Sequence, residues 1–330
     1  MSSPAVSVIL PTLNERRYIR DCLDSLIAQD YQSVVEILVV DGGSTDGTRT
    51  IVGSQGHPVR LLDNPRITAA AGMNVGLRQA RGDVLCRADA HSRYASDYVR
   101  RCVEVLLETG ADNVGGVMRP VGTTSFGRAV AAVTCSPIGI GGGRFHFSEA
   151  RAAVDTVYLG CWWRTTLEGL GGYDETRLQW AAEDQELNFR IRRAGGRVLL
   201  DPSIRSWYFP RETPRSLARQ YFNYGMAKAS TLAKHGSLPT WRPLAPAALV
   251  GTSVAGMAVG NRWTRLAVPL LHTVSCAVAA TRLGRKPGVS TRSVFGALEI
   301  CHWSYGLGFL NGVARIVRGR RFDTRPTGHR

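Results

Sequence analysis

The chain has 330 residues, of which 44% are hydrophobic and 20% are charged, and its formal net charge is +15. This length and apolar content exclude a disordered tail and allow one large α/β domain with an appendage, or two modest domains. The charge is uneven, because residues 236–330 hold 13 Lys and Arg against Glu299 and Asp323 alone. A negatively charged partner should therefore be sought at this C-terminal segment.

Short β-rich runs alternate with helix-like stretches through the first third of the chain. The predicted strands are 6–10, 35–40, 59–62, 84–86 and 113–117, and the helical stretches include 18–28 and 68–81. This βαβ rhythm predicts a parallel sheet whose apolar strands are buried on both faces. Ligands of such sheets bind at the carboxyl ends of the strands.

Polar segments follow three of these predicted strands. Residues 11–15 follow the first strand, 41–48 the second and 87–91 the fourth. A turn leading into a helix capped by Asp46 explains the glycines of the second segment without any ligand. The turn alone does not explain Asp41, so we retain a nucleotide-binding site at this edge of the sheet as the functional interpretation.

The fourth strand is followed by Asp89 and His91, which are two residues apart. In an extended segment their side chains would point the same way, and a carboxylate and an imidazole can share a divalent metal ion. Such an isolated pair is more often surface decoration than a metal site.

Glu183 and Asp184 open a later predicted helix. Acids are common in the first turn of any helix, so the pair alone is a weak signal. Its chemical interpretation is a general base: sugar transfer to a hydroxyl with inversion needs a carboxylate that removes the acceptor proton, and an unpaired acid near a helix N-terminus stays ionised. The pair Trp162 and Trp163 could stack on sugar rings, and burial in the core is the alternative.

Three apolar runs lie in the basic C-terminal segment, at 244–259, 266–280 and 294–317, and Glu299 and His302 interrupt the last. Arginines that alternate with apolar runs favour a membrane surface over a nucleic-acid partner. The first two runs are shorter than the roughly 20 residues of a spanning helix. The arginine-rich tail opposes an odd number of crossings, so an even number or none is expected, with buried helices of a soluble domain as the alternative.

The seven cysteines show neither a C-x-x-C pair nor a metal-ligand spacing. Reduced thiols in a cytosolic domain are therefore predicted. No basic and apolar leader precedes the first strand, so we expect the N-terminal domain to face the cytoplasm.

Together, these segments resemble the family 2 glycosyltransferases of GT-A fold. The resemblance covers about residues 5–235 and is strongest in Val6-Ser-Val-Ile-Leu-Pro-Thr-Leu-Asn-Glu15, Ile37-Leu-Val-Val-Asp-Gly-Gly-Ser-Thr-Asp-Gly-Thr48 and Gly82-Asp-Val-Leu-Cys-Arg-Ala-Asp-Ala-His91. Residues 155–160, 183–195 and 220–225 look most like the succinoglycan-type exopolysaccharide glycosyltransferases, which extend lipid-linked saccharides at the inner membrane.

The resemblance implies an α/β fold, the GT-A nucleotide-diphospho-sugar transferase fold with a Rossmann-like mixed sheet. It also implies a catalytic domain at 1–235, followed by a basic, apolar and helical membrane-association region at 236–330. A nucleotide-sugar donor, a polyprenyl-linked saccharide acceptor and the membrane are the expected partners. The inner (plasma) membrane is the expected location, with the catalytic domain in the cytoplasm, and a homo-oligomer stays open.

The same resemblance implies roles for single residues on the donor side. Pro11, Glu15 and Asp41 would bind the base and ribose of a sugar nucleotide, usually a UDP-sugar, and Asp89 would be the first acid of a metal-binding D-x-D motif. The second acid is here His91. Because imidazole is a better ligand for Mn²⁺ than for Mg²⁺, the preference between these two ions stays open.

On the acceptor side, Asp184 takes the position of the catalytic base, with Glu183, Trp162 and Trp163 beside the acceptor. The Q-x-x-R-W motif of processive membrane synthases is not matched. We therefore expect inverting, metal-dependent transfer of a single sugar to a hydroxyl of a lipid-linked saccharide.

Two other functions stay open. A polyprenyl-phosphate sugar synthase would use a phosphate acceptor that is already anionic and needs no base, so Glu183 and Asp184 favour a hydroxyl acceptor. An inactive sugar-nucleotide-binding scaffold in a membrane complex is supported only by His91, and Asp41, Asp89 and Asp184 count against it.

Overall fold

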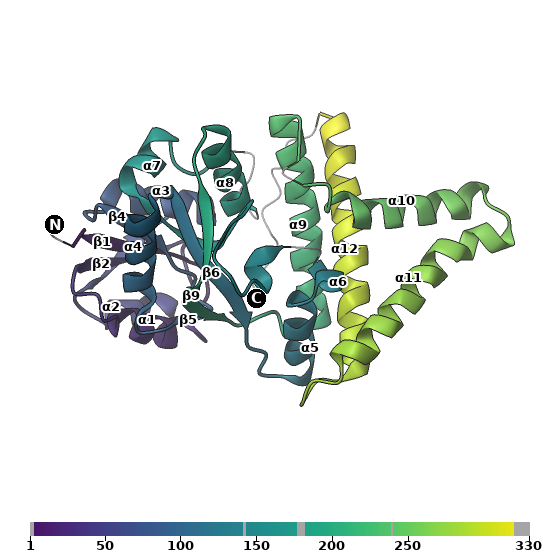
Figure 1. Ribbon diagram of the computed structural model, residues 1–330, viewed down its shortest axis with the longest axis horizontal. Helices are drawn as coiled ribbons and strands as arrows, with labels where there is room; N and C mark the ends of the chain where they lie inside the picture. The colour runs from purple at the N-terminus through teal and green to yellow at the C-terminus, as the bar shows by residue number, and fades with distance from the viewer. Residues whose placement is uncertain (1–2, 141–142, 177–181, 239, 320–330) are drawn as a thin grey trace. The chain divides into compact units, whose positions relative to one another are not determined.

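The computed structural model describes residues 3–140, 143–176, 182–238 and 240–319. The chain forms two compact units, each described here by itself. An α/β unit takes in the residues up to Arg119 and those from Arg144 to Tyr208, and a helical unit takes in Pro120–Gly143 and the residues from Phe209 on. Figure 1 shows the strands and helices of both units.

The α/β unit is built on one mixed sheet, which confirms the predicted fold class. Its strands are β1 (Val6–Thr12), β2 (Val34–Asp41), β3 (Val59–Asp63), β4 (Val84–Arg87), β5 (Ser92–Tyr94), β6 (Asn113–Pro120), β7 (Ala152–Ala153), β8 (Tyr158–Trp163) and β9 (Val198–Tyr208). Their order is β3-β2-β1-β4-β8-β6-β9-β5, with β7 beside β9. Strands β1 to β4 are parallel, whereas β8 runs antiparallel to both β4 and β6.

Helices cover both faces of this sheet. They are α1 (Ile19–Ile27), α2 (Thr48–Gly53), α3 (Ala69–Gln79), α4 (Tyr98–Thr109), α7 (Arg164–Gly169) and α8 (Glu183–Arg193), with a short 3₁₀ turn at Arg144–His146. Successive residues of β1 point to opposite faces. Val8 and Leu10 lie in a core with residues of α1 and α4, whereas Ile9 lies in a second core with residues of α3 and α8. The uninterrupted apolar run therefore reflects burial on both faces, as predicted.

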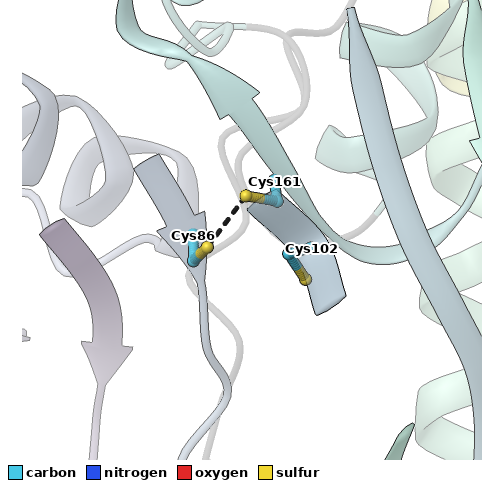
Figure 2. Close-up of side chains that lie close together, drawn as sticks. All are labelled: Cys86, Cys102 and Cys161. Atoms are coloured by element: carbon cyan, nitrogen blue, oxygen red, sulfur yellow. Dashed lines mark hydrogen bonds between the residues drawn. The ribbon is translucent and has the colours of Figure 1, made fainter. Parts of the chain in front are cut away.

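A cluster of three buried thiols lies in the first of these cores (Figure 2). Cys86 of β4 faces Cys161 of β8 across the antiparallel pair, their sulfurs are 2.9 Å apart, and Cys102 of α4 lies beside them. Burial raises the pKa of the Cys102 and Cys161 thiols, so both stay protonated at neutral pH. All seven cysteines are free thiols, in agreement with the prediction of reduced cysteines.

The helical unit has its own apolar core. Its helices are α5 (Ser125–Thr134), α6 (Pro137–Ile140), α9 (Pro214–His235), α10 (Leu244–Val259), α11 (Arg262–Leu283) and α12 (Thr291–Val317). Helices α9 and α12 pack closely through glycines, because a Cβ atom at Gly225 would overlap the Tyr305 carbonyl and one at Gly308 would overlap the Phe222 carbonyl. By these contacts α9 belongs to the helical unit, so this unit begins before the boundary predicted at 235/236. The functional division at that boundary stays a prediction.

Helix α11 carries the membrane signal. Its residues Arg265–Leu283 form the one stretch, within the described part of the chain, that is long and apolar enough to cross a membrane, with a mean hydropathy of 1.4 and 17% of the window buried. Helix α10 is apolar but has only 16 residues. Exposed apolar side chains gather on these two helices: Leu244, Val254, Met257, Val259, Trp263, Leu266, Leu270, Leu271, Val274 and Val278. By length and composition, α11 fits membrane association, and the number of crossings stays a prediction.

Candidate active site

The carboxyl ends of β1, β2 and β4 meet at one edge of the sheet. In the parallel register, Thr12 of β1 lies beside Asp41 of β2, and Ile9 of β1 lies beside Arg87 of β4. The three polar segments predicted from the sequence therefore leave the sheet next to one another, at the place where ligands of parallel sheets bind.

Hydrogen bonds from backbone N–H groups to side-chain oxygens join the loops after β1 and β2. Asn14 N–H donates to Ser44 Oγ (2.8 Å), Thr45 N–H donates to Asn14 Oδ1 (2.8 Å), and Glu15 N–H donates to Thr48 Oγ1 (2.9 Å). Asn14 itself has a φ of +54°, in the left-handed region that asparagine tolerates better than most residues. These contacts fix the position of Glu15 relative to the second loop.

Asp41 shapes its own loop. Its side chain is fully buried, and Oδ1 accepts hydrogen bonds from Gly43 N–H (3.0 Å), Ser44 N–H (2.9 Å) and Arg49 Nη1 (2.9 Å). The turn interpretation therefore accounts for Asp41 as well as for the glycines. Pro11 lies half-buried at the end of β1, where a Cβ atom on Gly72 of α3 would come within 3.1 Å of it. Contacts of either residue with a nucleotide stay predictions.

The centre of the candidate site is Arg87, to which the sequence assigned no role. Its guanidinium is 7% exposed and contacts three carboxylates from two segments. Nε lies 3.2 Å from Asp89 Oδ1, Nη2 lies 3.0 Å from Glu183 Oε1, and Nη1 makes a short ion pair with Asp184 Oδ1. The acids at the start of α8 and the acid after β4 thus share one buried cation.

Burial and these ion pairs shift the pKa values of Asp184 and Arg87. Burial raises the pKa of Asp184 to about 7, against the attraction of Arg87 and with the added repulsion of Glu183 and Asp89. Burial alone would lower the pKa of Arg87, but Asp184, Asp89 and Glu183 hold it well above its usual value. The expectation of an unpaired acid at Asp184 was wrong: this carboxylate is ion-paired, and its pKa lies near neutrality.

Tyr173 completes the surroundings of Asp184. Its hydroxyl donates to Asp184 Oδ1 (3.0 Å), and burial raises the pKa of this phenol well above its usual value. The side chain of Asn74 in α3 makes two hydrogen bonds with the Tyr173 backbone. Its Oδ1 accepts from the Tyr173 N–H (2.8 Å), and its Nδ2 donates to the Tyr173 carbonyl (2.9 Å). A group on another helix therefore orients the proton donor next to Asp184.

Helix α8 is tied to its neighbours by buried polar contacts. Arg190 donates to the carbonyls of Leu170 (2.8 Å) and Gly172 (2.7 Å), and Asn188 accepts from Asn113 Nδ2 of β6 (2.6 Å). Buried polar groups that are fully hydrogen-bonded hold a single arrangement. Glu183 and Asp184 are thus carried by a rigid element.

His91 lies in a turn and not in the extended segment assumed from the sequence. Ser92 N–H donates to the Asp89 carbonyl (3.1 Å), which closes the turn. The imidazole Nδ1 lies 3.3 Å from Glu15 Oε1, and the ring packs edge-to-face on Tyr208 with centroids 5.2 Å apart. Asp89 therefore contacts Arg87, whereas His91 contacts the carboxylate of Glu15, a residue that was predicted to bind the nucleotide.

The two tryptophans of β8 differ in burial. Trp162 is 0% exposed and lies in the core with Tyr173, so its ring has no face on which a sugar could stack. The core interpretation is correct for this residue. Trp163 is partly exposed, packs against the opposite core and keeps its predicted place beside the acceptor as a prediction only.

A cavity of about 370 Å³ opens next to these strand ends, and the sequence did not indicate it. It is lined by Asn64, Pro65, Arg66, Ala71, Val75, Arg78 and Glu175. The Oδ1 atom of Asn64 is buried without a hydrogen-bond partner, so it can accept from a ligand N–H or O–H group. A volume of this size suits a small molecule.

The mixed sheet and the polar strand ends are those of a GT-A fold. A mannosyltransferase from Pyrobaculum calidifontis, solved in complex with GDP-Man and Mn²⁺, has this fold with a TM-score of 0.56 at 22% identity over 95% of this chain and 87% of its own. S. aureus TarS residues 1–349, solved with UDP, gives 0.54 at 16% identity over 98% and 94%.

Residues 7–144 match the family described as glycosyl transferase family 2. The chain is a glycosyltransferase, and this part of it is similar to that family. It is 29% identical over 319 residues to the succinoglycan biosynthesis protein ExoA of Rhizobium meliloti, covering 94% of this chain and 95% of that protein. It is 25% identical over 240 residues, or 69% and 74%, to a dolichyl N-acetyl-α-D-glucosaminyl phosphate 3-β-D-2,3-diacetamido-2,3-dideoxy-β-D-glucuronosyltransferase of Methanococcus voltae.

Proposed function

We propose that this glycosyltransferase moves one sugar from a nucleotide sugar to a hydroxyl of a lipid-linked saccharide, with inversion, during cell-surface polysaccharide synthesis. Asp184 is the base that removes the proton of the attacking hydroxyl. The observation that carries the proposal is the cluster of Arg87 with Asp89, Glu183 and Asp184, because it joins the metal-motif acid and the base through one buried cation.

The environment of Asp184 suits proton transfer at neutral pH. A general base works best when its pKa lies near the working pH, and burial raises the pKa of Asp184 to about 7. Tyr173 and Arg87 both contact Oδ1, so the second oxygen is the one that can accept the proton of the acceptor. A single displacement with this base gives inversion. An anionic phosphate acceptor would need no such base, which favours the hydroxyl.

A divalent metal ion fits the residues after β4. Asp89 offers an oxygen and His91 a nitrogen, and a carboxylate on the other nitrogen is the contact that commonly orients a metal-binding imidazole. Glu15 supplies this carboxylate. A bound Mn²⁺ or Mg²⁺ would offset the negative charge of the departing nucleoside diphosphate. The mixed oxygen and nitrogen donors favour Mn²⁺.

The relatives support the donor and acceptor classes. The neighbours of known structure were solved with GDP-Man and with UDP, so a nucleotide-sugar donor is favoured and a UDP-sugar is tested first. One relative takes part in succinoglycan synthesis, and the name of the other places its acceptor sugar on a dolichyl phosphate. A polyprenyl-linked saccharide at the cytoplasmic face of the plasma membrane follows as the acceptor. The apolar surface of α11 would keep the protein at that membrane.

Thermal unfolding of the full protein with UDP-, GDP- and dTDP-sugars tests donor binding in the presence of Mn²⁺. A ligand that binds only the folded state increases the free energy of unfolding, by about 2.7 kcal/mol at a ligand concentration 100 times its Kd. The unfolding midpoint rises as a result. We expect one base class to raise the midpoint and the others to leave it unchanged. No shift with any nucleotide sugar would contradict the proposal.

Substitutions of Asp89 and His91 test two properties separately: metal-dependent nucleotide binding and the preference between Mn²⁺ and Mg²⁺. We expect Asp89→Ala to abolish the Mn²⁺-dependent part of nucleotide binding, whereas His91→Asp should keep activity and move the preference toward Mg²⁺, because an all-oxygen shell suits that ion. Rates measured with each ion check this. An unchanged ratio of Mn²⁺ to Mg²⁺ activity in His91→Asp would exclude His91 as a ligand.

Extraction of membranes tests the role of α11. We expect the full chain to sediment with membranes, to resist high salt and to dissolve in detergent, because buried apolar surface outweighs the contribution of about 1 kcal/mol from each basic residue near an anionic leaflet. The double variant Leu270→Gln and Leu271→Gln should increase the fraction released by salt. Leu107→Gln, at an exposed position of α4, is the matched control and should not. Complete release of the wild type by salt would contradict membrane insertion.

A chain cut after Lys234 would be a poor test of membrane association. Removing α12 would expose the face of α9 that packs against it, including the close contact at Gly225. Solubility of such a fragment would then depend on this new apolar surface as well as on the loss of α11. The full chain is therefore used.

A further inference from the structure

A second group of metal-binding side chains lies in the helical unit. His272 and Cys276 are one turn apart on α11, and His302 faces them from α12. His272 Nε2 lies 2.9 Å from His302 Nδ1, and Cys276 Sγ lies 3.5 Å from the first nitrogen and 3.9 Å from the second. Two nitrogens and one sulfur thus converge from two helices.

The outer nitrogen of each imidazole contacts an atom that can only accept a hydrogen bond. His302 Nε2 lies 2.9 Å from the Ile138 carbonyl oxygen, so Nε2 carries the hydrogen and neutral Nδ1 carries a lone pair. His272 Nδ1 lies 3.5 Å from Glu299 Oε1 without forming a hydrogen bond, so this contact leaves the tautomer of His272 open.

The lone pair of His302 Nδ1 faces His272 Nε2 across 2.9 Å, and Cys276 Sγ lies close to both nitrogens. A metal ion could bind the lone pairs of both nitrogens, and the thiolate of Cys276 would supply a third ligand and a compensating negative charge.

The distances suit a tetrahedral zinc ion. With Zn–N of about 2.0–2.1 Å and Zn–S of about 2.3 Å, tetrahedral angles place two nitrogens about 3.3 Å apart and a nitrogen and sulfur about 3.6 Å apart. The observed separations of 2.9, 3.5 and 3.9 Å lie within a few tenths of an ångström of these values.

The surroundings resemble the outer shell of a metal site. Glu299 Oε2 accepts from Trp303 Nε1 (2.8 Å), whereas Oε1 is buried without a hydrogen-bond partner and points toward His272. A carboxylate behind a histidine is the usual device for orienting a zinc ligand.

The thiol cluster of the α/β unit offers a useful contrast. Cys86, Cys102 and Cys161 are fully buried among apolar side chains. Among the hydrogen bonds of the described residues, none joins one of these three sulfurs to a carboxylate or carbonyl that could orient it as a metal ligand. That cluster is explained by core packing, whereas the mixed nitrogen and sulfur set is not.

We infer that His272, Cys276 and His302 form a structural Zn²⁺ site that fastens α11 to α12, with Glu299 and the Ile138 carbonyl as orienting contacts. The site lies in the helical unit and takes no part in the proposed sugar transfer. Metal binding here would hold α11, the helix long and apolar enough to cross a membrane, against its neighbour α12. A borderline-soft ion is favoured, because hard ions such as Mg²⁺ prefer oxygen ligands.

Metal analysis of the full protein tests the site. The protein is purified in detergent through a tag that binds no metal, saturated with Zn²⁺ and freed of loose ions by gel filtration. We expect about one tightly held zinc per chain, and at least tenfold less in Cys276→Ala and in the double variant His272→Ala with His302→Ala. Cys301→Ala removes a neighbouring buried thiol outside the ligand set and should keep the zinc. Equal zinc in all variants would overturn the proposal.

A measurement on the wild type guards against variants that do not fold. X-ray absorption at the zinc edge should show one sulfur at about 2.3 Å and nitrogens at about 2.0 Å. Replacement by Co²⁺ should give a thiolate-to-cobalt charge-transfer band. A shell of oxygen and nitrogen alone would overturn the assignment.

Discussion

Replacing Asp184 by asparagine is expected to lower turnover by about 100-fold or more, the range for loss of a positioned base. Asparagine keeps an oxygen that can accept from Tyr173 and Arg87, so the fold and donor binding should change little. Steady-state rates give kcat, and the thermal shift with the nucleotide sugar gives donor binding. The matched control is Glu183→Gln, at the preceding position of α8 and on the same guanidinium, which should keep much more activity.

The pH profile adds an independent check. The base must be deprotonated to act, and burial raises the pKa of Asp184 to about 7. The rate should therefore fall about tenfold for each pH unit below about 7 and level off above it. The wild type and Glu183→Gln should both show this limb, and residual activity of Asp184→Asn should not. Near wild-type turnover in Asp184→Asn would place the base elsewhere.

Replacing Arg87 by methionine should have the largest combined effect on stability and activity. Removal of one partner of a buried ion cluster leaves uncompensated charge and costs about 3–5 kcal/mol. Because Arg87 opposes the rise in the pKa of Asp184, its loss should also move the acid limb of the rate profile to higher pH. The unfolding midpoint and the pH profile measure the two effects.

Two further variants separate charge from geometry. Arg87→Lys keeps the positive charge but not the planar fork that contacts three carboxylates, so it should rescue stability only in part. Arg100→Met removes a more exposed arginine that pairs with Asp30 and Glu104, and it should change the unfolding midpoint little, because exposed ion pairs contribute little to stability. An Arg87→Met protein as stable as Arg100→Met would contradict a buried ion cluster.

The parallel half of the sheet could be predicted because its signal is local. Strands β1 to β4 are short apolar runs that end in polar segments, and such runs identify strands buried on both faces. In the antiparallel half only β6 was predicted, at 113–117, and its other described strands have no comparable signal. Strand β9 mixes polar and apolar residues and contains Pro202, and β8 ends in the tryptophans that were interpreted as sugar-stacking residues.

The sequence predicted the acidic residues of the candidate site, but it did not predict which side chains these residues contact. Asp89 and Asp184 were identified from motifs, yet the cation that joins them depends on segments almost 100 residues apart. No local pattern reveals such a pair. The same holds for the helical unit, where His302 was noted only as an interruption of an apolar run, although it faces His272 on the preceding helix.

The stereochemistry of the product tests the central claim most directly. The full protein in detergent is incubated with Mn²⁺, the nucleotide sugar selected by thermal shift and a polyprenyl-diphosphate-linked saccharide, and the product is analysed by mass spectrometry and by the anomeric coupling constant in NMR. We predict one added sugar on a hydroxyl, with its anomeric configuration inverted relative to the donor, and no product with Asp184→Asn over the same period. Retention of configuration, or transfer only to a free polyprenyl phosphate, would contradict the account.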